Sequence, residues 1–167
     1  MNQADITVHD RTVVDAALTE SERTGGPAAA LELPDGSIVT GKTSDLLGAC
    51  SALLLNALKE LAGIGHEIKI ISPQAIEPIQ SLKTKYLGSR NPRLHTDEVL
   101  IALSVSAATS EDAKLAMEQL PKLKGCQAHV SVMPGSVDIK QFKLLSVQAT
   151  FEAKYEKNSV FFNNKGV

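Results

Sequence analysis

The sequence predicts an α/β protein, in which a mixed sheet of about five strands has an antiparallel hairpin at one edge and helices packed on it. Short aliphatic and β-branched runs alternate with longer segments whose apolar residues recur every three or four positions. Two of the short runs flank Pro34-Asp35-Gly36, a tight-turn sequence that predicts the hairpin. The 167 residues, 43% hydrophobic and 22% charged, fit one domain over 1–167.

The elements are expected in a definite order along the chain. They are a helix over 10–24, a hairpin over 28–41, a helix over 44–62, a strand over 67–71, a helix over 73–87, a helical pair over 97–120, and a strand-helix-strand unit over 127–153. Residues 156–167 lack periodicity and are expected to form a frayed tail.

Local signals in the first half place its helices and strands. Gly25-Gly26-Pro27 ends the first helix, and Gly63 ends the second. Thr43 or Ser44 can cap the second helix, whose apolar residues cover most of its circumference. That helix should therefore lie between the sheet and another layer, or between subunits.

Local signals in the second half are equally specific. The β-branched run 67–71 predicts a strand, and Ser72-Pro73 then starts a helix that Pro78 kinks. Thr96-Asp97-Glu98 and Ser110-Glu111-Asp112 start the two helices of the pair. Strand, helix and strand after residue 127 are typical of two parallel strands joined by a crossover.

Composition excludes several classes of function. With 17 Lys plus Arg against 19 Asp plus Glu, the net charge of −2 gives no broad attraction for nucleic acid or an anionic membrane. The apolar run 46–58 is too short to span a bilayer, and the polar N-terminus resembles no signal peptide. Cys50 and Cys126 stand alone, which argues against a disulfide framework or a zinc site and favours the cytoplasm.

The stretch Gly36 to Thr43 matches the spacing of a phosphate-binding loop, with two glycines four residues apart followed by Lys42 and Thr43. However, Ile38 and Val39 are β-branched and favour an extended strand over the tight bend that such a loop requires. The sequence therefore argues against a true phosphate loop.

A smaller anion site remains open where the hairpin leads into the second helix. Gly41, Lys42, Thr43 and Ser44 would lie at the helix N-terminus, where free N–H groups favour an anion. The alternative is that Thr43 and Ser44 cap the helix and Lys42 is solvated.

The segment 88–98, called here the arginine loop, is the densest polar run. Arg90, Asn91 and Arg93 could hold a phosphate or carboxylate, while His95 is the candidate for proton transfer. The alternative is an Asn-Pro turn with helix caps and surface ion pairs. No metal site is expected: His66 and His129 have no Cys, Asp or Glu at metal-ligand spacing and are expected to be structural or surface residues, and any cofactor stays unidentified.

Several blocks together resemble the C-terminal part of uncharacterised protein family 0371. The similarity runs from about Thr12 to Tyr155 and rests on Arg23-Thr24-Gly25, on 33–36 with 38–44, on 71–73 with 76–80, and on 87–103. Members of that bacterial family are considerably longer, so the resemblance implies a C-terminal domain that lacks a larger N-terminal partner. It implies no reaction, and it points to the hairpin-to-helix corner and the arginine loop.

Two hypotheses follow. In the first, the domain binds a phosphate-containing small molecule between Lys42 and the arginine loop and contributes to an active site in the intact protein. In the second, it is a scaffold that packs on itself, as a homo-oligomer, or on the missing domain through the apolar helix 45–62.

Overall fold

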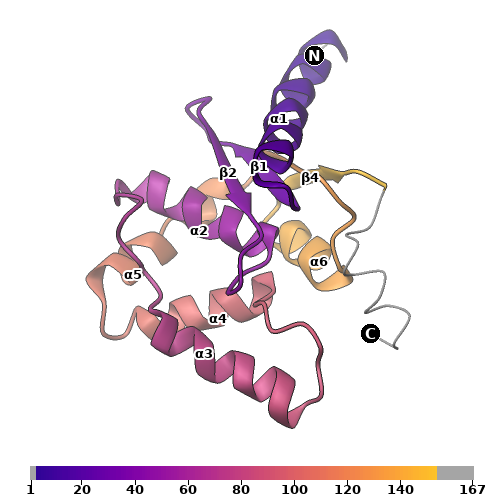
Figure 1. Cartoon of the computed structure of the whole chain (residues 1–167). Helices are drawn as coiled ribbons and strands as arrows, with labels where there is room; N and C mark the ends of the chain where they lie inside the picture. Colours follow the sequence, from indigo (N-terminus) through magenta and orange to yellow (C-terminus); the bar gives the residue numbers. More distant parts are fainter. Residues whose placement is uncertain (1–2, 154–167) are drawn as a thin grey trace.

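The computed structural model describes residues 3–153, with side chains from residue 12 onward. The elements, in order, are α1 (Gln3–Thr24), β1 (Ala28–Glu32), β2 (Ile38–Lys42), α2 (Ala49–Ala62), α3 (Pro73–Ser81), the π-helical turn η1 (Leu82–Tyr86), α4 (Thr96–Ser106), α5 (Glu111–Met117), the 3-10 turn η2 (Leu120–Leu123), β3 (Gln127–Val130), α6 (Ser136–Leu144) and β4 (Gln148–Phe151). Figure 1 shows their arrangement. The predicted tail, 156–167, lies outside the described residues.

One mixed sheet organises the fold, as predicted. Its strand order is β2-β1-β3-β4, with β2 and β3 antiparallel to β1, and β4 parallel to β3. The described residues form four strands where about five were expected. The hairpin places β2 at one edge of the sheet, and the α6 crossover joins the parallel pair.

The predicted strand at 67–71 is wrong, because this segment forms no strand. Within it, the adjacent residues Ile70 and Ile71 are both buried in the core, whereas residues 66–69 are exposed. Successive side chains of a strand point to opposite faces, so a strand could not place both isoleucines in one core. The loop is also held by Lys59, whose Nζ donates to the His66 carbonyl at 2.8 Å.

The predicted start of the second helix is also wrong. Gly41 and Lys42 continue strand β2, and α2 begins at Ala49 instead of residue 44. The intervening backbone pairs with the arginine loop: Leu94 N donates to Leu46 O at 3.0 Å, and Gly48 N donates to Leu94 O at 3.3 Å. Those long-range bonds take the place of a helical first turn.

Two other helix boundaries differ from the prediction. The first helix starts at Gln3 instead of residue 10, although it ends at Thr24 as expected. The predicted helix 73–87 is α-helical only to Ser81 and continues as the π-helical turn η1, with Pro78 inside α3. The helical pair, predicted over 97–120, begins one residue earlier, at Thr96, and the strand-helix-strand unit lies within its predicted range.

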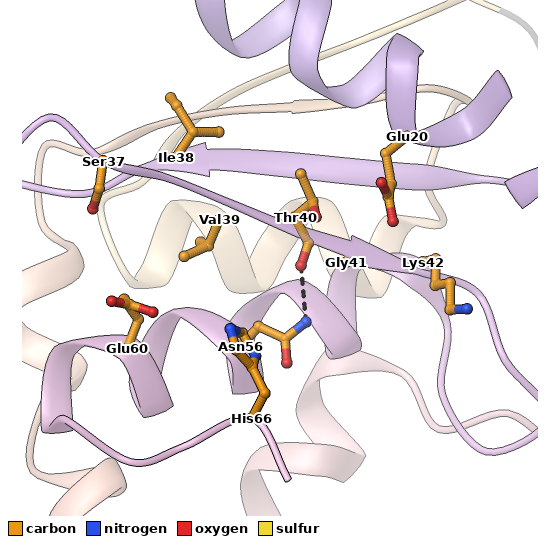
Figure 2. Close-up of a pocket in the computed structure, with 10 residues that line it drawn as sticks. All are labelled: Glu20, Ser37, Ile38, Val39, Thr40, Gly41, Lys42, Asn56, Glu60 and His66. Atoms are coloured by element: carbon orange, nitrogen blue, oxygen red, sulfur yellow. Dashed lines mark hydrogen bonds between the residues drawn. The ribbon is translucent and has the colours of Figure 1, made fainter. Parts of the chain in front are cut away.

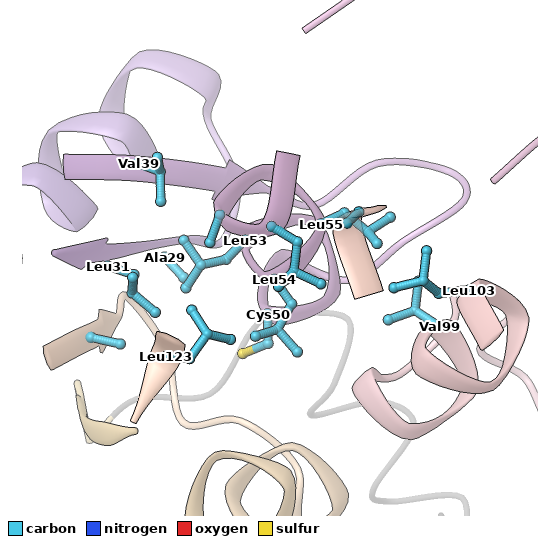
Figure 3. Packing of buried hydrophobic residues seen from close by; sticks show 14 of the residues in the cluster. Ala29, Leu31, Val39, Cys50, Leu53, Leu54, Leu55, Val99, Leu103 and Leu123 are labelled. Carbon is cyan, nitrogen blue, oxygen red and sulfur yellow. The ribbon is translucent and has the colours of Figure 1, made fainter. Parts of the chain in front are cut away.

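Helices cover the two faces of the sheet unequally (Figure 1). On one face α1 packs Val13 and Ala17 against Ala30 of β1. The other face carries α2, with α4 and α5 beyond it, around a core that includes Leu31, Leu53 and Leu103 (Figure 3). Because α2 lies between the sheet and further helices, its apolar surface is used inside this domain, not for the docking that the second hypothesis assigned to it.

Candidate functional site

A cleft of about 410 Å³ runs along the free edge of β2 (Figure 2). Its walls come from the end of α1, from β2, from α2 and from the loop that follows α2. The lining residues are Glu20, Ser37, Ile38, Val39, Thr40, Gly41, Lys42, Asn56, Glu60 and His66. Of the residues proposed from the sequence, Gly41 and Lys42 line this cleft, and those of the arginine loop do not.

The register of the hairpin determines which backbone groups of β2 face this cleft. Leu33 N donates to Ser37 O at one end of the hairpin, and Thr43 N donates to Pro27 O at the other. These two bonds, together with the strand register, fix which residues of β2 bond to β1. In an antiparallel pair these residues alternate with residues that face away. The N–H and C=O groups of Ile38, Thr40 and Lys42 therefore point to the free edge, which leaves them available to another strand.

Asn56 covers one of these edge groups. Its Nδ2 donates to the Thr40 carbonyl at 2.8 Å from the adjacent helix α2 (Figure 2). The remaining outward N–H and C=O groups of β2 bond to none of the backbone or side-chain groups for which the structure of residues 12–153 gives contacts. The edge is therefore only partly protected against pairing with another strand.

Charges of both signs border the cleft. Arg23 donates to Glu20 at 2.6 and 3.0 Å, and this hydrogen bond lowers the pKa of the Glu20 carboxyl group. Lys42 and Glu60 are exposed, and neither has an oppositely charged side chain within 4 Å among the residues described, although the charge of Lys42 also helps to lower the pKa of Glu20. The cleft thus suits a polar segment that carries both charges better than a simple anion.

The arginine loop lies against the segment that links β2 to α2. Arg93 Nε donates to the Ser44 carbonyl at 2.6 Å, so two stretches 49 residues apart, which the first hypothesis places around one ligand, are in contact. Asn91 Oδ1 accepts from Arg93 N at 3.1 Å, which makes the Asn-Pro turn. Arg90 is exposed, whereas the Arg93 guanidinium is partly engaged by this backbone contact.

Ser44 has a role different from the predicted helix cap. Its Oγ accepts from the backbone N–H groups of Leu46 and Leu47 at 3.3 and 3.2 Å. Ser44 N also donates to the Leu47 carbonyl, and Thr43 N donates to Pro27 O. Both residues therefore shape a turn between β2 and α2.

The start of α4, at the end of the arginine loop, is occupied by carboxylates of the protein itself. Glu98 Oε1 accepts from the backbone N–H of His95 at 2.8 Å, and the His95 ring lies 3.7 Å from the same oxygen. Asp138 of α6 accepts from both the N–H and the hydroxyl of Thr96 at 3.0 and 2.8 Å. Asp97 Oδ1 accepts from Glu98 N at 2.7 Å. An incoming anion would meet these negative groups at the helix N-terminus.

Lys83 supplies the balancing positive charge. Its buried Nζ donates to Glu98 Oε1 at 2.9 Å and to the Arg93 carbonyl at 2.5 Å. The π-helical turn η1 carries this lysine inward, while Leu82, Lys85 and Tyr86 of the same turn remain exposed. Sequence reasoning missed Lys83, because its partners are 10 and 15 residues away on other elements.

A second polar cluster joins β3 and β4. The buried His129 ring contacts Thr150 Oγ1 at 2.7 Å through Nδ1 and Glu152 Oε2 at 2.8 Å through Nε2. Both ring nitrogens are therefore engaged, as expected for a satisfied histidine inside a sheet. Of the two roles expected for His129, structural or surface, these contacts fit the structural one.

No group of three His, Cys, Asp or Glu side chains in the part of the chain that the structure describes could hold a metal ion. No helix within that part is both long and apolar enough to cross a bilayer.

Comparison with known proteins decides the family. Residues 9–161 match the domain family described as "Domain of unknown function DUF1846, C-terminal". The chain belongs to this DUF1846 C-terminal family. The resemblance to family 0371 agrees with this result, because curated UPF0371 proteins are similar over nearly the whole chain.

Relatives of this DUF1846 domain come from several bacteria. The UPF0371 proteins of Corynebacterium glutamicum (strain R) and Corynebacterium efficiens are 57% and 58% identical to it over 161 residues. That of Streptococcus thermophilus (strain CNRZ 1066) is 48% identical over 161 residues. In each case 96% of this chain is covered, but only 32% or 33% of the relative. The DUF1846 domain thus spans about a third of the length of these proteins.

Proposed function

We propose that this DUF1846 domain is an assembly domain, which docks on the remaining two thirds of the longer proteins through the exposed apolar side chains of η1 and α4. This surface is called here the η1–α4 surface. It consists of Leu82, Tyr86, Leu87, Ile101 and Val105, which are between 49% and 78% exposed.

The number of exposed apolar side chains on α4 and on or directly after η1 carries this proposal. Single exposed apolar residues are ordinary, but five of the nine large ones among the described residues lie between positions 82 and 105. The two elements are tied together by the ion pair of Lys83 with Glu98. Water contact with so much apolar surface is unfavourable, and docking on another part of a longer chain would remove it.

Hydrogen exchange tests the proposal. Exchange should be measured on the full-length relative from Corynebacterium glutamicum and on this 167-residue chain, with each amide normalised to its intrinsic rate. We expect amides in the segments equivalent to 82–87 and 99–105 to exchange at least about tenfold more slowly in the full-length protein. The polar turn 34–37 serves as the internal control and should exchange equally in both.

Variants of the full-length protein connect any protection to the apolar contacts. Serine at the positions equivalent to Tyr86 and Leu87 should remove the added protection, whereas serine at the position of the exposed Lys85 should retain it. Equal exchange of the η1–α4 surface in both proteins would overturn the proposal, and so would protection that the Tyr86 and Leu87 changes leave intact.

A small phosphate-containing ligand is the second candidate, favoured by the contact that brings the Ser44 turn and the arginine loop together. Arg90, three residues before Arg93 in the same loop, is exposed and has no ion-pair partner among the side chains described. Calorimetric titration with pyrophosphate and with nucleoside triphosphates tests this candidate. Heat that disappears in Arg90→Ala but persists in Lys85→Ala would support it, and absence of heat with every ligand would overturn it.

A further inference from the structure

We propose that the cleft beside β2 binds the adenine base of a nucleoside, which would pair with the Thr40 backbone and the Asn56 side chain. The volume of this cleft, about 410 Å³, is in the range of small-molecule sites. Its lining includes no residue of the η1–α4 surface or of the arginine loop. The proposal therefore stands apart from the two functions proposed above.

Thr40 presents a donor and an acceptor side by side in this cleft. In the hairpin register, its N–H and C=O groups both point away from β1. Among the groups for which the structure of residues 12–153 gives contacts, the N–H has no partner, and the carbonyl accepts from Asn56 alone. A carbonyl oxygen has a second lone pair, so Thr40 can still donate one hydrogen bond and accept another.

The Asn56 amide extends this row of hydrogen-bonding groups. Figure 2 shows its side chain reaching from α2 to β2, where Nδ2 donates to the Thr40 carbonyl at 2.8 Å. An amide has two N–H donors and one carbonyl acceptor, so the second N–H and Oδ1 are left for a ligand. The groups offered to a ligand are then the Thr40 N–H, the Thr40 carbonyl, and the acceptor and donor of Asn56.

This row matches two edges of adenine at the same time. On one edge, N1 accepts and the N6 amino group donates, which fits the N–H and the carbonyl of Thr40. On the other edge, the second N6 hydrogen and N7 form the donor and acceptor pair that an asparagine amide recognises. Guanine has two acceptors, O6 and N7, on that second edge, and a pyrimidine has no N7. Adenine is therefore the base that satisfies both residues.

The charges of the cleft favour an uncharged base over a phosphate group. Glu20 and Glu60 both line the cleft, and Lys42 is the single lysine or arginine among its lining residues. The pKa of Glu20 is lowered by its hydrogen bond with Arg23 and also by the charge of Lys42, so that charge is already partly engaged. A phosphate would face more carboxylates than cations. We therefore expect adenosine to bind at least as tightly as adenosine monophosphate.

An NMR titration of the 167-residue chain with adenosine tests the proposal. We expect shifts of the Ile38–Lys42 backbone amides and of the Asn56 side-chain amide, with a dissociation constant below about 1 mM. Inosine carries a carbonyl in place of the N6 amino group, which reverses the donor and acceptor that face Thr40. Its affinity should be at least about tenfold lower, because the polar groups of the site would be left unpaired.

Variants connect the binding to the groups named above. Asn56→Asp replaces the donor that faces N7 with a carboxylate oxygen and should weaken adenosine binding at least about tenfold. Gln74→Glu makes the same kind of change at an exposed residue of α3 outside the cleft, and should leave the affinity within about twofold. Thr40→Val retains the backbone groups and should bind adenosine normally. Amide spectra without ligand establish that each variant is folded, and the inosine comparison decides the proposal should Asn56→Asp unfold.

Three results would overturn this inference. The first is the absence of any shift with adenosine up to about 5 mM, well above the affinity expected. The second is equal affinity for adenosine and inosine, which would mean that the site does not read the N1 and N6 edge. The third is binding that a folded Asn56→Asp chain retains in full, or whose shifts lie outside the cleft, for example in the arginine loop.

Discussion

Gly41 shows how a single residue fixes the approach of a helix to the sheet. A Cβ added at this position would lie 2.3 Å from Leu53 N and 2.6 Å from Leu53 Cα. These are backbone atoms of α2, which cannot move aside as the end of a side chain could. The spacing of glycines around Lys42 resembled a phosphate loop, and the structure explains this glycine by packing alone.

We therefore expect Gly41→Ala to lower the free energy of unfolding by about 3 kcal/mol, because the methyl group overpacks the contact between β2 and α2. Urea denaturation followed by circular dichroism measures this change. Gly26→Ala is the matched control: its Cβ meets no atom within 4 Å, so it should change stability by less than about 0.5 kcal/mol. Equal stabilities of the two variants would show that α2 does not approach β2 this closely.

At the scale of elements, Lys83 joins three segments that are separate in the sequence. It lies in η1, donates to the Arg93 carbonyl in the arginine loop, and pairs with Glu98 in α4. A buried ammonium group is tolerated here because both acceptors are within hydrogen-bond distance. The lysine therefore sets the position of the arginine loop relative to the helices on either side.

Lys83→Ala should cost about 1 to 3 kcal/mol of unfolding free energy, because it leaves Glu98 and the Arg93 carbonyl without their donor. The partial exposure of the Glu98 side chain to water keeps this cost below that of a fully buried pair. Urea unfolding measures the loss, and Lys85→Ala, which removes an exposed lysine from the same turn, should be nearly neutral. A similar stability for the two variants would contradict the role assigned to Lys83.

The elements that the sequence predicted correctly are those with local signals. Gly25 after α1, the turn Pro34-Asp35-Gly36 and the cap Ser110 all act within a few residues, and the structure places element boundaries beside them. The start of α2 was wrong because its first residues bond to Leu94, far along the chain. The false strand at 67–71 shows the same limit, since its isoleucines are stabilised by a core that local pattern cannot reveal.

At the scale of the whole molecule, the candidate site divides into two places. The chain brings Ser44 next to Arg93, but Lys42 lines a different cleft along the edge of β2. Asn56, Glu60 and His66 also line that cleft, and no motif marked them in the sequence. Their placement depends on how α2 packs on the sheet, so only the assembled fold could identify them.

The buried thiol of Cys50 makes the stability of the folded chain depend on pH. Burial raises the pKa of the Cys50 thiol well above its usual value of 9.0, and the nearby Asp138 carboxylate adds to the effect. The folded chain therefore keeps this proton at an alkaline pH at which the unfolded chain has lost it. Since the unfolded state binds fewer protons there, stability must fall as the pH rises above about 9.

Cys50→Ala removes this titration and should flatten the alkaline loss of stability. Between about pH 8 and pH 10.5, the original chain should lose more unfolding free energy than the variant, with a difference that approaches about 1.4 kcal/mol per pH unit above the ordinary thiol pKa. Urea titrations at several pH values measure the two slopes, and the constant cost of the smaller side chain cancels from the comparison. Cys126, whose pKa burial also raises, contributes equally to both chains. Parallel pH profiles would mean that Cys50 ionises as readily in the folded chain as in the unfolded one, and hence that α2 does not enclose it.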